Sequence, residues 1–146
     1  MENLEYNIQI TADKKKVWSI MLEPDTYKEW AGVSWPGSDY EGAWGKGESI
    51  KFISPGQGGT LAKITEYRPH DFILAEHIGI VNADGSEDTD SDAAKGWIGT
   101  TESYTFTTQN GKTDLKVNIK CPPEWVSMFN DGWPKALDKL KEMCEG

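Results

Sequence analysis

The chain has 146 residues, of which 24 are acidic and 15 basic, giving a formal net charge of −9 at pH 7. This length fits one domain, residues 1–146, with enough chain to bury a hydrophobic core. An excess of negative charge is unfavourable for contact with nucleic-acid phosphates or an anionic membrane surface. We therefore expect neither nucleic acid nor a membrane as a partner.

The prediction of a cellular compartment rests on targeting signals that the sequence lacks. The sequence has no run of about eighteen apolar residues that would span a membrane, and Met1 to Glu5 lack the basic and apolar regions of a signal peptide. The cysteines, Cys121 and Cys144, provide neither a disulfide framework nor a metal-binding spacing. We interpret them as free thiols and predict a cytoplasmic protein.

The first third of the chain predicts one strand followed by two short helices. Apolar and polar residues alternate from Glu5 to Thr11, as in a half-buried strand. Thr11 to Asp13 offer a cap for a helix over Lys14 to Leu22. Pro24 suits the first turn of a second helix, Pro24 to Ala31.

The middle of the chain predicts an antiparallel sheet. Glycine and proline separate alternating segments, and Asn110-Gly111 is a strong hairpin signal. We expect five or six strands after the first. The segments are Glu48 to Ser54, Thr60 to Tyr67, Phe72 to Val81, Gly99 to Thr108 and Thr113 to Lys120.

A long amphipathic helix is predicted at the C-terminus, over Glu124 to Cys144, because its apolar residues recur at intervals of three and four. Gly132 and Pro134 lie inside this helix, and an interior proline removes a hydrogen bond and kinks or interrupts a helix. We expect a bend at this point, with space beneath it.

This order of elements resembles the START-like, or helix-grip (SRPBCC), superfamily, and the residues resemble its branch of activators of the heat-shock-protein-90 ATPase. The resemblance covers nearly the whole chain. It implies an α+β helix-grip fold, β-α-α-β(5-6)-α, in which an antiparallel sheet wraps around the last helix and encloses a cavity. The passages that carry it are Ile10-Thr11-Ala12-Asp13 with Val17-Trp18, Tyr27-Lys28-Glu29-Trp30, Leu61 to Pro69, and Gly132-Trp133 with Leu137 and Leu140.

An acidic stretch, Ala83 to Lys95, is predicted to be a solvated, mobile loop. Asp88, Asp90 and Asp92 alternate as the first ligands of a calcium loop do. Such a loop also needs glycine and glutamate at positions that hold Ala93 and Gly99 here, so we favour the solvated loop.

Few residues suggest catalysis or metal binding. The two histidines have no third ligand at a zinc spacing, and no cofactor motif is present, so we predict no metal and no cofactor. Glu76 and His77 interrupt the apolar segment Phe72 to Val81, and one of them must face the last helix. There it would orient a ligand or act as an acid or base, although a hydrogen-bonded or rim position is the more common role.

The aromatic residues are the positive signal. Seven tryptophans in a chain of this size exceed what a core requires. We predict a cavity that binds a small apolar molecule. The alternatives are a co-chaperone-like domain that binds a chaperone through its surface and, less favoured, a cofactor-free cyclase, hydrolase or dehydratase. The predicted cavity residues are Trp30, Phe52, Glu76, His77, Trp97, Phe129 and Trp133; no catalytic residue is assigned.

Overall fold

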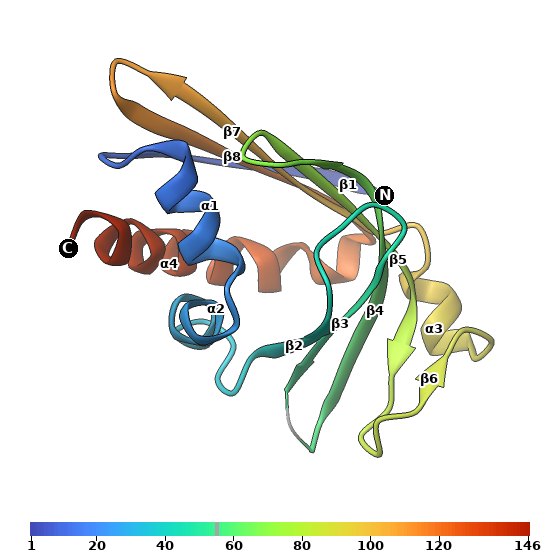
Figure 1. Ribbon diagram of the computed structural model, residues 1–146. Coiled ribbons are helices and arrows are strands. Elements are labelled where there is room, and N and C mark those ends of the chain that lie inside the picture. The colour runs from blue at the N-terminus through green and yellow to red at the C-terminus, as the bar shows by residue number, and fades with distance from the viewer. Residues whose placement is uncertain (55) are drawn as a thin grey trace.

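The computed structural model describes residues 1–54 and 56–146. An antiparallel sheet of eight strands curves over a long C-terminal helix (Figure 1), which confirms the predicted α+β architecture. The elements in chain order are β1 (Glu2–Ile10), α1 (Lys14–Leu22), α2 (Pro24–Gly32), β2 (Asp39–Gly42), β3 (Ser49–Ser54), β4 (Gly58–Arg68), β5 (Phe72–Val81), β6 (Glu87–Asp88), α3 (Asp92–Trp97), β7 (Thr101–Gln109), β8 (Lys112–Cys121), the 3-10 turn η1 (Pro123–Trp125) and α4 (Val126–Glu145).

The strands are ordered β1-β8-β7-β5-β4-β3-β2, and the short β6 pairs with the end of β5. The β7–β8 hairpin turns at Asn110 and Gly111, both with positive φ, as the sequence predicts. Two short strands, β2 and β6, were not predicted. With the five predicted segments they bring the strands after β1 to seven, where five or six were expected.

The two helices after β1 begin where the sequence predicts. The Asp13 side chain accepts a hydrogen bond from the backbone N–H of Lys16, at 2.8 Å, and so caps α1. Pro24 occupies the first turn of α2, where its missing N–H costs nothing. The buried residues of these helices, among them Val17, Met21 and Trp30, face the space between the sheet and α4.

The acidic stretch is more ordered than predicted. Glu87 and Asp88 pair with the end of β5, and Asp92–Trp97 form α3. The Asp88 carboxylate accepts from the backbone N–H of Asp90 and Ser91, and the Ser91 hydroxyl accepts from the N–H of Ala94. The segment is mostly exposed, as predicted for a solvated loop, but it is not a loop throughout. These local hydrogen bonds and the burial of Ala94 and Trp97 stabilise a short strand and a helix within it.

The C-terminal helix begins later than predicted and is not interrupted. A 3-10 turn at Pro123–Trp125 precedes α4, which runs through Pro134 to Glu145. The proline has no N–H to donate to the carbonyl of Asn130, which is an exposed residue. The helix is nevertheless continuous at Pro134, and the bend expected there stays a prediction.

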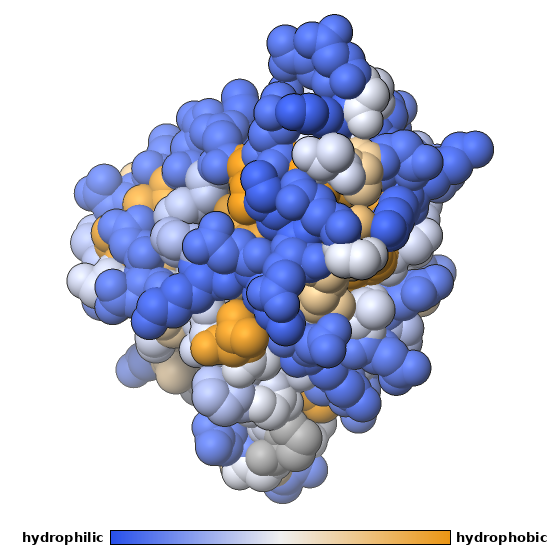
Figure 2. Space-filling view, turned by 90° about the vertical axis from the view of Figure 1, so that its left-hand side faces the viewer, coloured by the Kyte–Doolittle hydropathy of each residue, from blue (hydrophilic) through white to orange (hydrophobic). Residues whose placement is uncertain are grey.

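The outer surface near α1, α2 and the C-terminal end of α4 is largely hydrophilic, with small separated hydrophobic spots (Figure 2). This matches the low mean hydropathy of −0.61. No helix in the described part of the chain is long and apolar enough to cross a membrane. The apolar residues are instead concentrated between the sheet and α4.

Candidate functional site

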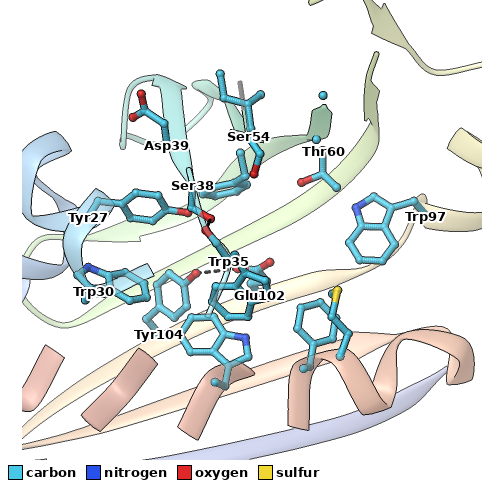
Figure 3. Close-up of a pocket in the computed structure, with 17 residues that line it drawn as sticks. Tyr27, Trp30, Trp35, Ser38, Asp39, Ser54, Thr60, Trp97, Glu102 and Tyr104 are labelled. Carbon is cyan, nitrogen blue, oxygen red and sulfur yellow. Dashed lines mark hydrogen bonds between the residues drawn. The ribbon is translucent and has the colours of Figure 1, made fainter. Parts of the chain in front are cut away.

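A cavity of about 250 Å³ lies between the first half of α4, α2 and the strands β3, β4 and β7 (Figure 3). Eight of the side chains that line it are aromatic, and two are acidic. The aromatic residues are Tyr27, Trp30, Trp35, Phe52, Trp97, Tyr104, Phe129 and Trp133, and the acidic ones are Asp39 and Glu102.

Five of the seven predicted cavity residues line this space: Trp30, Phe52, Trp97, Phe129 and Trp133. They come from α2, β3, α3 and α4, so segments far apart in the sequence meet here. The other two predicted residues, Glu76 and His77, are neighbours on β5 and separate to opposite faces of the sheet.

Glu76 is exposed, so the prediction that it lines the cavity was wrong. Successive side chains of a strand point to opposite faces. On β5 the buried face carries Ile73, Ala75 and His77, so Glu76 must face solvent. His77 faces inward but stands behind the lining, where it contacts Glu102.

The helical wall of the cavity is built from residues one turn apart. Tyr27 and Trp30 lie on one face of α2 with ring centroids 5.1 Å apart, and Phe129 and Trp133 lie on one face of α4. The indole Nε1–H of Trp30 donates to the carbonyl of Met21, at 3.1 Å, which fixes that ring. The Trp30 and Trp133 centroids are 5.9 Å apart, so the two helical faces meet directly.

Gly132 lets the segment after α2 approach α4. A Cβ at this position would lie 2.5 Å from the Trp35 ring, so only glycine leaves room for that indole. The hydroxyl of Ser34 donates to the Gly132 carbonyl at 2.6 Å, which ties the two segments together. This contact places Trp35 against Trp133, with centroids 5.5 Å apart.

Glu102 is the more buried of the two carboxylates in the site. Its side chain is only 12% exposed, against 27% for Asp39. One carboxylate oxygen lies 3.1 Å from His77 Nε2. The other accepts from the Tyr104 hydroxyl at 2.7 Å (Figure 3). Burial by itself would raise the pKa of Glu102, but the hydrogen bonds from His77 and Tyr104 and the electrostatic attraction of His77 outweigh burial and hold the pKa below its ordinary value. The cavity therefore contains an ionised carboxylate.

Glu102 was not among the predicted site residues, although the sequence contains a signal for it. Glu102, Tyr104 and Phe106 occupy alternate positions on β7, so an inward-facing Tyr104 and Phe106 imply an inward-facing Glu102. Its hydrogen bond to His77 could not be predicted in the same way, because it depends on how β5 and β7 pair.

The two tyrosines near Glu102 are neutral hydroxyl groups. Burial raises the pKa of Tyr104 well above its ordinary value, and the adjacent Glu102 raises it further. Burial likewise raises the pKa of Tyr27. The His77 ring is 1% exposed and lies between Phe52 and Trp97, with centroids 6.0 and 5.3 Å away.

The described residues contain no cluster of three or more histidine, cysteine, aspartate or glutamate side chains arranged to hold a metal ion. Cys121 and Cys144 are buried and unpaired with each other. Burial raises the pKa of Cys144 to about 11 and raises that of Cys121 as well. Both are thiols at neutral pH, a state unsuited to nucleophilic attack.

A larger groove, of about 650 Å³, adjoins the cavity on the outer side of Trp97. Trp97 and Met128 line both spaces, and Trp125 lines the groove. Trp125 and Met128 are 39% and 37% exposed. Met128 thus marks where the cavity wall reaches the surface.

The curved sheet, the long helix it surrounds and the cavity between them define a helix-grip protein of the START-like class. The chain belongs to the family described as activator of Hsp90 ATPase homolog 1-like protein, whose model matches residues 11–145. No curated protein sequence matches the chain.

Solved structures share this fold. The Aha1 dimer from Colwellia psychrerythraea is 24% identical, with a TM-score of 0.75, and the alignment covers 99% of this chain and 97% of that one. Protein MLL2253 from Mesorhizobium loti is 14% identical, with a TM-score of 0.75 and coverage of 97% and 96%. CalU16 from Micromonospora echinospora is 15% identical, with a TM-score of 0.69 and coverage of 97% and 75%. At these sequence identities the similarity shows a shared fold and nothing more.

Proposed function

We propose that this protein binds a small, largely apolar molecule in the cavity between α4 and the sheet. The observation that carries the proposal is the combination of eight aromatic lining residues with one buried, ionised carboxylate. An apolar pocket with few, well-placed polar groups is typical of ligand sites in proteins. The aromatic rings would supply the free energy of binding, and Glu102 would orient the ligand.

The size of the cavity limits the ligand. Pockets for drug-sized molecules measure about 300–1,000 Å³, and this cavity, of about 250 Å³, is slightly smaller. A ligand that lies wholly inside is therefore about the size of a substituted aromatic ring. A longer molecule would have to extend past Met128 into the outer groove.

Native mass spectrometry of the protein purified from its source tests this proposal. We expect a bound small molecule on the wild type and none on Thr60→Phe, because Thr60 lines the cavity and a phenyl ring there would fill it. Thr107→Phe, which changes an exposed threonine of β7, is the matched control and should retain the molecule.

Circular dichroism of both variants controls for folding. The proposal would be contradicted if the wild type carried no small molecule and bound no single-ring aromatic probe in a titration of tryptophan fluorescence. It would also be contradicted if Thr60→Phe, correctly folded, bound the molecule as tightly as the wild type.

A second candidate function is a chaperone-binding role, favoured by the exposed Trp125 and Met128 beside the outer groove. Exposed apolar side chains that line one hollow are typical of protein-interaction surfaces. Stimulation of the ATPase of a heat-shock-protein-90 chaperone, measured with the wild type and Trp125→Ala, tests this role. No stimulation by the wild type would exclude it.

A cofactor-free cyclase, hydrolase or dehydratase is the least supported function. It requires an acid or base that faces the ligand, and Glu102 is the group in the lining with that chemistry. Ligand binding requires no such catalytic group, so we rank ligand binding first. A cytoplasmic location, with both buried cysteines as free thiols, completes the proposal.

A further inference from the structure

We propose that the ligand is an organic cation, an alkylated or methylated ammonium, held between the aromatic rings and the Glu102 carboxylate. This inference rests on the proposed function and specifies its ligand class. It follows from three features of the cavity: the sign of its charge, the position of His77 and the arrangement of its rings.

The charged side chains in the cavity lining are all negative. Its lining includes Asp39 and Glu102 but no lysine, arginine or histidine. Asp39 has a cation partner, because Lys28 Nζ lies 3.5 Å from its carboxylate. Among the described residues no lysine or arginine forms an ion pair with Glu102.

His77 contacts Glu102 from behind the lining, not from the cavity side. Its Nε2 lies 3.1 Å from one carboxylate oxygen, and its buried Nδ1 has no hydrogen-bond partner among the described residues. On the cavity side, Glu102 therefore meets no positively charged side chain of the lining.

A buried charge is stable only when it is paired or well hydrogen-bonded. Two donors, from His77 and Tyr104, occupy one position on each oxygen of Glu102. Each carboxylate oxygen can accept a further hydrogen bond. A ligand ammonium would bring a positive charge to the cavity side of Glu102, and one that retains an N–H would also supply a donor.

The rings favour the same ligand class. The face of an aromatic ring carries partial negative charge and attracts cations, and rings that surround quaternary ammonium groups are a recurrent binding arrangement. Here rings from α2, the segment after it, β7 and α4 are neighbours around Trp133. Its centroid lies 5.9 Å from Trp30, 5.5 Å from Trp35 and 5.9 Å from Tyr104.

The same features disfavour an anion. The buried indole N–H groups of Trp97 and Trp133 have no partner among the described residues and could donate to a ligand oxygen. A carboxylate or phosphate would nevertheless lie near the like charge of Glu102, with no basic side chain in the lining to pair with it. The remaining competitor is a neutral molecule that donates a hydrogen bond to Glu102. Charge is therefore the property that an experiment must isolate.

Two pairs of probes differ in charge but hardly in shape. Choline is compared with 3,3-dimethylbutan-1-ol, and benzyltrimethylammonium with neopentylbenzene. Each pair replaces a quaternary nitrogen by carbon. Binding to the wild type is measured by tryptophan fluorescence, because Trp30, Trp35, Trp97 and Trp133 line the cavity. We expect the cation of at least one pair to bind about tenfold more tightly than its neutral partner.

Glu102→Gln should remove most of this advantage while leaving the affinity for the neutral probes within about twofold. Glu66→Gln, an exposed residue of β4, makes the same change in net charge and should leave the advantage intact. If Glu102→Gln does not fold, the comparison of paired probes on the wild type still decides the question.

The possible outcomes separate the two proposals. Equal or tighter binding of the neutral probe in both pairs would overturn the cation inference and leave the apolar binding function standing. Absence of binding by all four probes would overturn both. An advantage of the cation that Glu66→Gln abolishes and Glu102→Gln preserves would assign it to the surface charge and overturn the inference.

Discussion

The two halves of α4 meet the sheet in different ways. The C-terminal half buries Ala136, Leu137, Leu140 and Cys144, which are at most 3% exposed and belong to a continuous core. The N-terminal half presents Phe129 and Trp133, which line the cavity. One helix thus has a filled contact at one end and a hollow at the other.

The two halves differ in the side chains they present. Small and aliphatic groups of the C-terminal half belong to the core, and protein cores contain few voids. The N-terminal half meets large planar rings, with Trp133 at 34° to Trp30 and 72° to Trp35. Four of the seven tryptophans that suggested a cavity line this space.

The largest expected effect lies in the filled half. Leu140→Ala removes a fully buried side chain and leaves a void, which should lower the free energy of unfolding by about 2–5 kcal/mol. Met128→Ala, on the same helix at the edge of the cavity, should change it by less than about 1 kcal/mol because Met128 is already partly solvated. Urea unfolding followed by circular dichroism measures both. Equal losses would show that the two halves do not differ in packing.

An intermediate effect is expected at Gly132, where Trp35 packs against the N-terminal half of α4. Gly132→Ala should cost about 1–3 kcal/mol of unfolding free energy, because its Cβ would lie 2.5 Å from the Trp35 ring and force it to move. It should also shift the tryptophan fluorescence, since Trp35 lines the cavity.

Gly32→Ala is the matched control for that substitution. No atom lies within 4 Å of a Cβ at Gly32, so alanine there should be neutral or stabilising by up to about 1 kcal/mol. Thermal unfolding of both variants tests the pair. A Gly132→Ala protein as stable as Gly32→Ala would mean that Trp35 is not held against α4.

The smallest effect concerns the carboxylate of Glu102, which lies in the cavity beside the N-terminal half of α4. Because the folded protein holds the pKa of Glu102 below its ordinary value of 4.5, its carboxylate stabilises the fold fully above that value. This contribution is lost as the pH falls through the pKa of the folded state. We expect it to be about 1 kcal/mol, the net value of a hydrogen bond.

The measurement is the unfolding free energy of the wild type and Glu102→Gln between neutral and acid pH. The difference between the two proteins should shrink as the pH falls below 4.5. Glu66→Gln removes an exposed carboxylate that forms no ion pair with the described residues, and so corrects for general charge effects. A difference that is independent of pH would show that Glu102 is not ionised in the folded protein.

The sequence by itself determined the order and type of the main elements. Period-two alternation, the Asn110-Gly111 turn, the Asp13 cap and the apolar spacing of α4 are local signals, and each depends on residues close together in the chain. The surplus of aromatic residues also predicted a cavity, and five of the predicted cavity residues line the space that was found.

Only the tertiary structure decided which polar groups reach the cavity. Alternation places Glu76 and His77 on opposite faces, but only strand pairing and the position of α4 decide which face is buried. The same pairing brings Glu102 within 3.1 Å of His77, 25 positions earlier in the chain. The acidic segment likewise became a strand and a helix through its pairing with β5 and the burial of Trp97. A chain's local pattern determines its elements, whereas the charge of a site depends on contacts between elements, which no local pattern contains.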